Sequence, residues 1–380
     1  MKKKYELKNY NIRLLLLLIV ITVIGILAIG SAKESVQIRQ IQGFGLGFVL
    51  LMILTFLDYH MILKFSWLIY GLNLVILLLV QFFGESTNNS QRWIEILGIR
   101  FQPSELAKIL LILFYAQFIM KNKEKLNSFS NLLKAVALIV PPLVLVYKQP
   151  DLSTTVIILI VFCLMMYVGG ISYKVILGVL AVIIPALVIF LFIVLQPDQT
   201  IIESYQQNRI LAFLQPEKYK LTTAYQTQNS ITAIGSGQLW GKGLNNNEVG
   251  SVKNGNYISE AQTDFIFAII GEELGFVGGL AVILLETFIA FECFVIAARA
   301  PDDAGRIICA GVGGVVCFQS FINIGVATGI IPNTGIPLPF VSYGLTSLVS
   351  LYIGMGIVMN VSLLRGRSFN TKSKNYDIGV

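Results

Sequence analysis

Residues 12–31, IRLLLLLIVITVIGILAIGS, are apolar at almost every position, and Arg13 is the one charged residue among them. An α-helix needs about 20 such residues to cross the hydrocarbon core of a bilayer. Runs of similar character recur along the 380 residues and predict about ten membrane spans. The predicted spans are 12–31, 43–57, 65–83, 104–120, 132–147, 152–170, 175–195, 265–298, 307–331 and 341–364. The span at 265–298 is over-long, so we expect it to be broken or partly interfacial. The sequence thus predicts an all-α polytopic membrane protein, a single integral domain over residues 1–380.

The composition agrees with this class and excludes others. Hydrophobic residues make up 55% of the chain and charged residues only 13%. The net charge of +7 does not indicate nucleic-acid binding, because Lys and Arg lie at the ends of apolar runs and form no basic face. Four cysteines lie inside apolar segments without a Cys-x-x-Cys pair, and the chain has one His, so neither a disulfide framework nor a zinc site is predicted. We expect the cysteines to be packing residues.

The Lys and Arg residues predict an orientation. Three lysines, Lys2 to Lys4, precede a first apolar run that is longer than the apolar region of a signal peptide, so we expect an uncleaved first helix. Ten spans put both chain ends on one side. That side holds seventeen Lys and Arg, against six in the short opposite loops. By the positive-inside rule both termini are predicted to be cytoplasmic, with a tail at 365–380.

The segment 259–275, SEAQTDFIFAIIGEELG, places acids at the entrance to an apolar helix. Asp264, Glu272 and Glu273 lie within ten residues, and ionised side chains lose hydration at a membrane boundary. Spacing alone leaves two interpretations of Asp264. It caps the following helix, where free N–H groups and the positive dipole end favour an acid, or it takes part in chemistry.

Charged residues also gather where two other predicted helices begin. The outer loop 84–103 contains Arg92 and leads into Glu105 and Lys108, which share a helix face at spacing i, i+3. Asp151 follows Gln149 and opens the sixth span. A local ion pair and a first-turn acid that complements the helix dipole are the structural alternatives at these positions.

A long segment, 196–264, lacks an apolar span and is predicted to be a large extracytoplasmic loop between spans 7 and 8. Such a length without function is unusual in a compact protein. Residues 205–213, with Arg209, suggest an amphipathic stretch on the membrane surface, and 224–234 a short helix. The glycines of 235–244, GSGQLWGKGL, allow tight turns and close backbone approach to a ligand. They do not form a nucleotide-binding fingerprint, because no strand precedes them.

Residues 329–347, GIIPNTGIPLPFVSYGLTS, contain three prolines within eight residues and cannot form a regular helix. Backbone without helical hydrogen bonds is tolerated at membrane depth only where protein buries it or water reaches it. We therefore predict a re-entrant or cavity-lining segment between spans 9 and 10.

Five motifs together resemble the SEDS family (shape, elongation, division and sporulation), which includes RodA, FtsW and SpoVE. The motifs are Arg92-Trp93 through Gln102-Pro103-Ser104-Glu105-Leu106-Ala107-Lys108, Gln149-Pro150-Asp151-Leu152, Ala233-Ile234-Gly235-Ser236-Gly237 with Gly241-Lys242-Gly243, Thr263-Asp264-Phe265 with Gly271-Glu272-Glu273-Leu274-Gly275, and Asn323-Ile324-Gly325 with the segment from Pro332 to Gly344. They follow the family's order from about residue 90 to 350. Gln262, Gln238 and Leu345 depart from the family's usual residues, which weakens any choice between its elongation, division and sporulation members.

The resemblance implies a peptidoglycan glycosyltransferase that polymerises lipid II at the outer face of a bacterial plasma membrane. It implies that Asp264 is the base that takes the proton of the acceptor's 4-hydroxyl, with inversion of the donor sugar and loss of polyprenyl pyrophosphate. Positive charge for the pyrophosphate is expected from four outer-side residues, Arg92, Lys108, Arg209 and Lys242. By likeness, Glu105, Lys108 and Asp151 form a polar centre beneath the long loop, and Ser342 contacts the substrate.

The resemblance also implies a partner, a class B penicillin-binding protein, beside lipid II and membrane lipids. No cofactor is predicted with certainty; a divalent cation stays possible, because scattered carboxylates do not define a coordination set. Trp93 and Trp240 are expected to be interfacial anchors, and Glu272 and Glu273 structural or partner-facing. Two rival functions stay open: a lipid II flippase, for which Glu286 and Glu292 are the acids deep in a span, and a non-catalytic scaffold.

Overall fold

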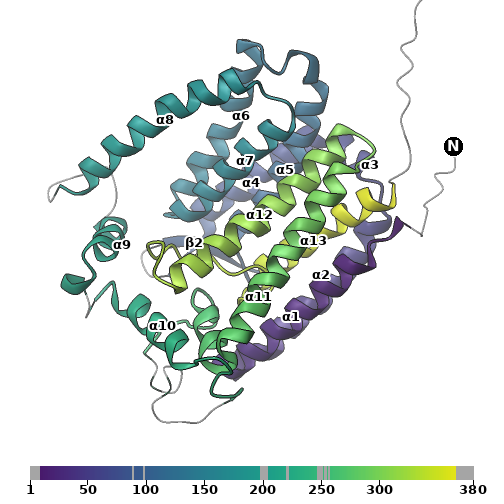
Figure 1. The fold of residues 1–380 in the computed structure, drawn as a ribbon. Coiled ribbons are helices and arrows are strands. Elements are labelled where there is room, and N and C mark those ends of the chain that lie inside the picture. The colour runs from purple at the N-terminus through teal and green to yellow at the C-terminus, as the bar shows by residue number, and fades with distance from the viewer. Residues whose placement is uncertain are drawn as a thin grey trace, which may run out of the picture.

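The computed structural model describes residues 9–87, 90–96, 99–196, 204–219, 222–245, 251, 255 and 257–364, and most of them are helical (Figure 1). Long helices lie at all ten predicted spans. They are α1 (Ile12–Ala32), α2 (Glu34–Phe56), α4 (Ser66–Phe83), α5 (Pro103–Lys121), α6 (Phe129–Tyr147), α7 (Leu152–Val168), α8 (Tyr173–Val194), α11 (Ile266–Ala298), α12 (Asp303–Ala327) and α13 (Leu345–Leu363). Among the described residues, eight helices are long and apolar enough to cross a membrane, and α7 is a shorter apolar helix of 17 residues. The all-α membrane fold is confirmed, while the count of ten crossings stays a prediction.

Several helix boundaries differ from the expected ones. Helix α2 begins at Glu34, nine residues before the predicted start at Gly43. Hydropathy marks the part of a helix that meets lipid, whereas the polar first turns of α2, with Arg39, continue the same helix beyond it. Helix α13 begins at Leu345, four residues later than predicted, because the preceding residues belong to the irregular proline-rich segment. The predicted tail at 365–380 and residues 197–203 of the long loop lie outside the described residues.

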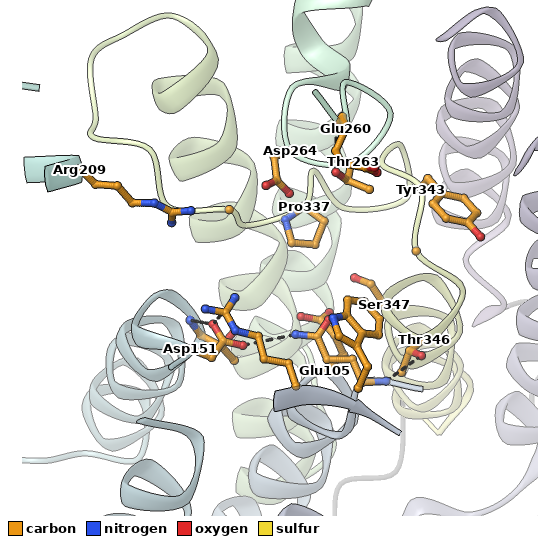
Figure 2. Close-up of a pocket in the computed structure, with 16 residues that line it drawn as sticks. Glu105, Asp151, Arg209, Glu260, Thr263, Asp264, Pro337, Tyr343, Thr346 and Ser347 are labelled. Atoms are coloured by element: carbon orange, nitrogen blue, oxygen red, sulfur yellow. Dashed lines mark hydrogen bonds and ion pairs between the residues drawn. The ribbon is translucent and has the colours of Figure 1, made fainter. Parts of the chain in front are cut away.

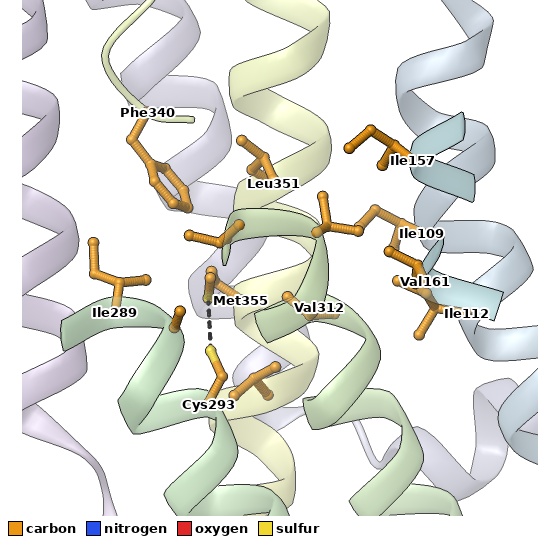
Figure 3. Close-up of a cluster of buried hydrophobic side chains, with 14 of the residues drawn as sticks. Ile109, Ile112, Ile157, Val161, Ile289, Cys293, Val312, Phe340, Leu351 and Met355 are labelled. Atoms are coloured by element: carbon orange, nitrogen blue, oxygen red, sulfur yellow. Dashed lines mark hydrogen bonds between the residues drawn. The ribbon is translucent and has the colours of Figure 1, made fainter. Parts of the chain in front are cut away.

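The core lies where α5, α12 and α13 meet α7 and α11. In α5, α12 and α13 about three-quarters of the apolar window is buried, against 28–39% in α1, α2, α4, α6 and α11. Figure 3 shows Ile112, Val312 and Met355 converging from α5, α12 and α13, with the Sγ atom of Cys293 3.8 Å from the Sδ atom of Met355. Of the four cysteines, Cys293 and Cys309 are buried packing residues as predicted; Cys163 and Cys317 are exposed.

A break in α11 confirms the prediction for the over-long span. Gly275 has φ 66°, a left-handed conformation that interrupts the helix. The glycine-rich segment supplies the hydrogen bonds that the break removes. Phe276 and Val277 donate their backbone N–H to the carbonyls of Gln238 and Leu239, at 2.8 and 3.2 Å. In return, Lys242 and Gly243 donate to the carbonyls of Glu272 and Glu273, at 3.0 and 2.9 Å. The sequence predicted that these glycines allow close backbone approach to a ligand; in the structure the close approach is to the backbone of α11 instead.

The two ends of the described chain meet at one end of the bundle. The hydroxyl of Ser362 donates to the carbonyl of Asn9 at 2.9 Å. The short helix α3 (Tyr59–Lys64) lies at this end (Figure 1). Its His60 contacts Asp58 through Nδ1 at 2.7 Å and Asp302, which caps α12, through Nε2 at 2.6 Å. These contacts join the α2–α4 connection to the start of α12.

The opposite end carries the elements that the spans do not account for. Three strands, β1 (Glu85–Thr87), β2 (Ser90–Ile96) and β3 (Ile99–Phe101), form an antiparallel sheet where the sequence predicted a loop. The long loop contributes α9 (Ser204–Leu214), η3 (Pro216–Tyr219) and α10 (Tyr225–Ser236). Another short turn, η2 (Lys123–Lys125), joins α5 to α6 at the end of the bundle that carries α3, where Lys123 forms an ion pair of 2.6 Å with Asp303. Helices α9 and α10 agree with the predicted amphipathic stretch and short helix.

The proline-rich segment, 328–344, is irregular as predicted and packs against the residues before α11. The backbone N–H of Tyr343 donates to the carbonyl of Gln262 at 2.8 Å, and the hydroxyl of Ser342 donates to the carbonyl of Thr263 at 2.5 Å. The side-chain amide of Asn323, on α12, donates to the carbonyls of Asp264 and Ile336 at 2.9 and 2.7 Å. Side chains and backbone from three separate parts of the chain thus fix the position of Asp264.

Candidate functional site

A cavity of about 360 Å³ lies between the strands, the starts of α5, α7 and α13, helix α9 and the proline-rich segment (Figure 2). Five of the eight residues that the sequence singled out line it: Arg92, Glu105, Asp151, Arg209 and Asp264. These residues come from five elements and span 172 positions between Arg92 and Asp264. Such convergence of charged side chains in one cavity is typical of a binding or active site.

Asp264 does not cap α11. The capping position is Phe265, and no side chain makes a capping hydrogen bond there. The carboxylate instead lies against the backbone of Gly335, where a Cβ atom would come within 3.3 Å of Oδ2. Burial raises the pKa of Asp264 above the usual value of an aspartate; Arg209 and Arg92 act to lower it, and Glu260 adds to the rise. The helix-cap interpretation is therefore not supported, and Asp264 is a carboxylate with increased basicity.

Arg92 and Asp151 form one polar group at the edge of the cavity. The guanidinium of Arg92 donates to the carbonyl of Gln149 at 3.2 Å and to that of Pro150, and its Nη1 lies 4.0 Å from Oδ1 of Asp151. Asp151 also accepts from the backbone N–H of Thr154 at 3.2 Å, so it is the N-cap of α7, whereas the structural alternative placed it in the first turn. It therefore combines a helix cap with a place in the cavity wall.

Glu105 and Lys108 form an ion pair of 2.9 Å on α5, and both side chains are only 3% exposed. Glu105 lines the cavity, whereas Lys108 is not among its lining residues. The Oε2 atom of Glu105 has no hydrogen-bond partner among the described residues. Glu105 thus lines the cavity while its carboxylate is paired with a lysine of the same helix.

Two predicted substrate contacts have other partners in the structure. Lys242 forms an ion pair of 2.8 Å with the buried Glu272, outside the lining of the cavity. This pair agrees with the structural role expected for Glu272. Ser342 is buried, where it donates to Thr263 and accepts from the backbone N–H of Leu338 at 2.8 Å. Both residues contact backbone or side chains of the segments that surround the cavity.

A second cavity, of about 620 Å³, shares part of its wall with the first. Trp93, Glu260, Thr263, Tyr343 and Gly344 line both. Its other lining residues include three cations, Lys33, Arg39 and Arg100. Trp93, expected to be a membrane anchor, thus lies between two cavities, whereas Trp240 is 75% exposed, in agreement with an anchor.

Sequence reasoning missed the three cations of the second cavity because it counted them only as loop charges. A usable signal was present in α2: Val36, Arg39 and Gln42 recur at a spacing of three residues, which places them on one helix face.

Among the residues that the structure describes, no group of three or more His, Cys, Asp or Glu is placed to hold a metal ion.

Comparisons with known proteins give a consistent result. Residues 8–366 match the FTSW_RODA_SPOVE family model, described as "Cell cycle protein". The chain is 34% identical to "Peptidoglycan glycosyltransferase MrdB" of Escherichia coli (strain K12), over 92% of each chain. It is 34% identical to "Stage V sporulation protein E" of Bacillus subtilis (strain 168), over 85% of this chain and 86% of that protein.

Two solved structures share the fold over nearly the whole chain. One is described as "Structural coordination of polymerization and crosslinking by a peptidoglycan synthase complex"; it has a TM-score of 0.76 and 28% identity, and the match covers 93% of this chain and 97% of that one. The other is the rod shape determining protein RodA of Thermus thermophilus, with a TM-score of 0.69, 27% identity, and coverage of 94% and 98%.

Proposed function

Because this chain belongs to the FtsW, RodA and SpoVE family of membrane proteins, we propose that it is a peptidoglycan glycosyltransferase that polymerises lipid II with Asp264 as its catalytic base. The observation that carries the role of Asp264 is its position, in one cavity with Arg92 and Arg209. A base for the acceptor hydroxyl and cations for a leaving pyrophosphate are the two groups that this reaction requires.

The proposed reaction is an inverting displacement. Asp264 accepts the proton of the acceptor's 4-hydroxyl, and the hydroxyl oxygen forms a bond to the anomeric carbon of the donor. The bond from that carbon to the pyrophosphate oxygen breaks, and Arg92 and Arg209 stabilise the negative charge that the leaving group gains. No enzyme nucleophile takes part, in contrast to the covalent route of retaining glycosidases.

The two adjoining cavities fit two lipid-linked saccharides. The donor carries its pyrophosphate on the carbon that reacts, so this group must lie beside Asp264, near Arg92 and Arg209. The acceptor reacts through a hydroxyl at the far end of its disaccharide from its own pyrophosphate. We therefore place the acceptor pyrophosphate in the second cavity, where Lys33, Arg39 and Arg100 supply positive charge.

The site is proposed to face the outside of a bacterial plasma membrane, with both termini in the cytoplasm. The contact between Asn9 and Ser362 supports this arrangement, because it joins the two described ends of the chain at the end of the bundle away from the cavities (Figure 1). The excess of Lys and Arg on that side supports it further.

Two other functions are less favoured. A flippase needs a polar route through the bilayer, but the acid buried at mid-span, Glu286, borders a cavity lined mainly by apolar residues. A scaffold would not need a carboxylate that shares a cavity with two arginines. We also propose a class B penicillin-binding protein as partner, since a similar structure is described as coordinating polymerisation and crosslinking in a peptidoglycan synthase complex.

The test is polymerisation of lipid II by purified protein in detergent, with and without the transpeptidase. We expect glycan polymer from the wild type and a loss of at least about 100-fold in Asp264→Asn, the usual contribution of a general base. Glu217→Gln is the matched control, because Glu217 is exposed and lines neither cavity. Full activity of Asp264→Asn would place the base elsewhere, and absence of polymer from the wild type with its partner would overturn the enzymatic function.

A further inference from the structure

Glu260 lies four residues before Asp264, on the wall shared by the two cavities. Its backbone has φ 56°, a conformation uncommon for residues other than glycine. Thr263 holds this turn, because its N–H and its hydroxyl both donate to the carbonyl of Glu260, at 3.0 and 2.8 Å. The segment therefore keeps a carboxylate at the junction of the cavities at some conformational cost.

The side chain of Glu260 is held by a neutral partner. The amide of Gln262 donates to its Oε2 at 2.5 Å, and Gln262 is itself only 5% exposed. An amide orients a carboxylate without cancelling its charge. Among the described residues, no Lys or Arg forms an ion pair with Glu260, in contrast to Glu105 with Lys108 and Asp151 with Arg92. Gln262 thus holds the carboxylate of Glu260 at the wall that the two cavities share.

The carboxylate of Glu260 bears on two opposing effects of the arginines in the site. Two arginines beside Asp264 suit a departing pyrophosphate, but they also stabilise the ionised carboxylate and so weaken it as a base. On the basis of the proposed function, we infer that Glu260 is a positioning residue that acts through Asp264: its carboxylate, held by Gln262 on the wall that the two cavities share, is the counter-charge to Arg92 and Arg209. Figure 2 shows Glu260 and Arg209 on different sides of Asp264.

Other charged groups line the same junction. Lys33 and Arg39 come from the α1–α2 region, and Glu95 and Arg100 from the strands. The electrostatic influences on Asp264 come from Arg209, Arg92 and Glu260, and of these Glu260 alone raises the pKa of Asp264. Removing its charge should therefore lower that pKa, and a weaker base should react more slowly.

The experiment is the pH dependence of lipid II polymerisation at saturating substrate, for the wild type, Glu260→Gln, Glu260→Asp and the control Glu217→Gln. Glu260→Gln is expected to move the acid limb of the rate to lower pH by on the order of half a unit and to lower the plateau, with KM little changed. Glu260→Asp should return the acid limb most of the way to its wild-type pH, and the control should match the wild type.

The outcomes separate this inference from the function on which it rests. An unchanged acid limb in Glu260→Gln, or a loss that appears only as a higher KM, would overturn the role of Glu260 while Asp264→Asn still abolishes polymerisation. An active Asp264→Asn would instead overturn the assignment of the base. A fluorescence melting curve of Glu260→Gln that matches the wild type shows that any change comes from charge and not from folding.

Discussion

Arg209 and Glu260 have opposite effects on the pKa of Asp264, so substitutions at the two positions should shift that pKa in opposite directions. Arg209 lowers the pKa of Asp264, so Arg209→Gln should raise it further. The base works only when it is deprotonated. As the pH is lowered, the rate of that variant should therefore begin to fall about one pH unit above the point where the wild type does. The measurement is the rate of polymerisation between pH 4 and 8, roughly the range where a raised carboxyl titrates.

A shift of the Arg209→Gln limb to lower pH would contradict the electrostatic description of the site. The variant should also show a lower plateau, since Arg209 is proposed to stabilise the leaving pyrophosphate.

Glu105 and Lys108 give a second prediction at single residues. Removing one partner of a buried ion pair leaves an uncompensated charge, which costs about 3–5 kcal/mol. Lys108→Met should therefore lower the melting temperature of the purified protein, and Glu105→Gln with Lys108→Met should recover much of the loss. Thermal unfolding in detergent measures both. A double variant no more stable than Lys108→Met would show that the two side chains do not stabilise the protein as a pair.

The individual residues of the first cavity were within reach of sequence reasoning, and those of the second were not. Asp264, Glu105 and Asp151 stand out because an ionised side chain is costly at a membrane boundary. Arg39 and Arg100 stand near other loop charges and are distinguished only by folding, which brings α2 beside β3 and the proline-rich segment.

At the scale of elements, the glycine-rich segment and the break in α11 depend on each other. A Cβ atom at Gly241 would lie 2.2 Å from the carbonyl oxygen of Glu273, and Gly241 has φ 78°. Gly241→Ala should therefore destabilise the protein by at least about 1–3 kcal/mol, as overpacking does, and should lower its melting temperature. Gly235→Ala is the control: Gly235 lies in α10 with open space around it, so alanine should be neutral or stabilising there.

Equal melting temperatures for Gly241→Ala and Gly235→Ala would show that the segment can move away from α11. The sequence predicted close backbone approach of these glycines to a ligand and missed α11 as the partner, because the segment and the break are 30 or more positions apart. It likewise predicted the spans from hydropathy, which carries no information about the short sheet between α4 and α5.

At the scale of the whole molecule, the prediction is the orientation in the membrane. In a background with the four cysteines replaced, Glu217→Cys should react with a membrane-impermeant maleimide added to intact spheroplasts. Lys123→Cys, at a position 56% exposed in the side chain and at the other end of the bundle, should react only after the membrane is opened. The reverse pattern would show that the cavities face the cytoplasm and would contradict the proposal that the substrate is taken from the outer face of the membrane.

The break at Gly275 also bears on which part of α11 crosses the hydrocarbon layer of the membrane. Side chains from Ile266 to Glu273 are buried in protein, whereas Phe276, just beyond the break, is 63% exposed and apolar, as a lipid-facing residue would be. The 24 residues from Gly275 to Ala298 make about 36 Å of helix, enough for a hydrocarbon layer of about 30 Å without the preceding turns. On the proposed function, the sugars would therefore react in the hydrated headgroup zone while the isoprenoid tails of both substrates stay dissolved in the bilayer.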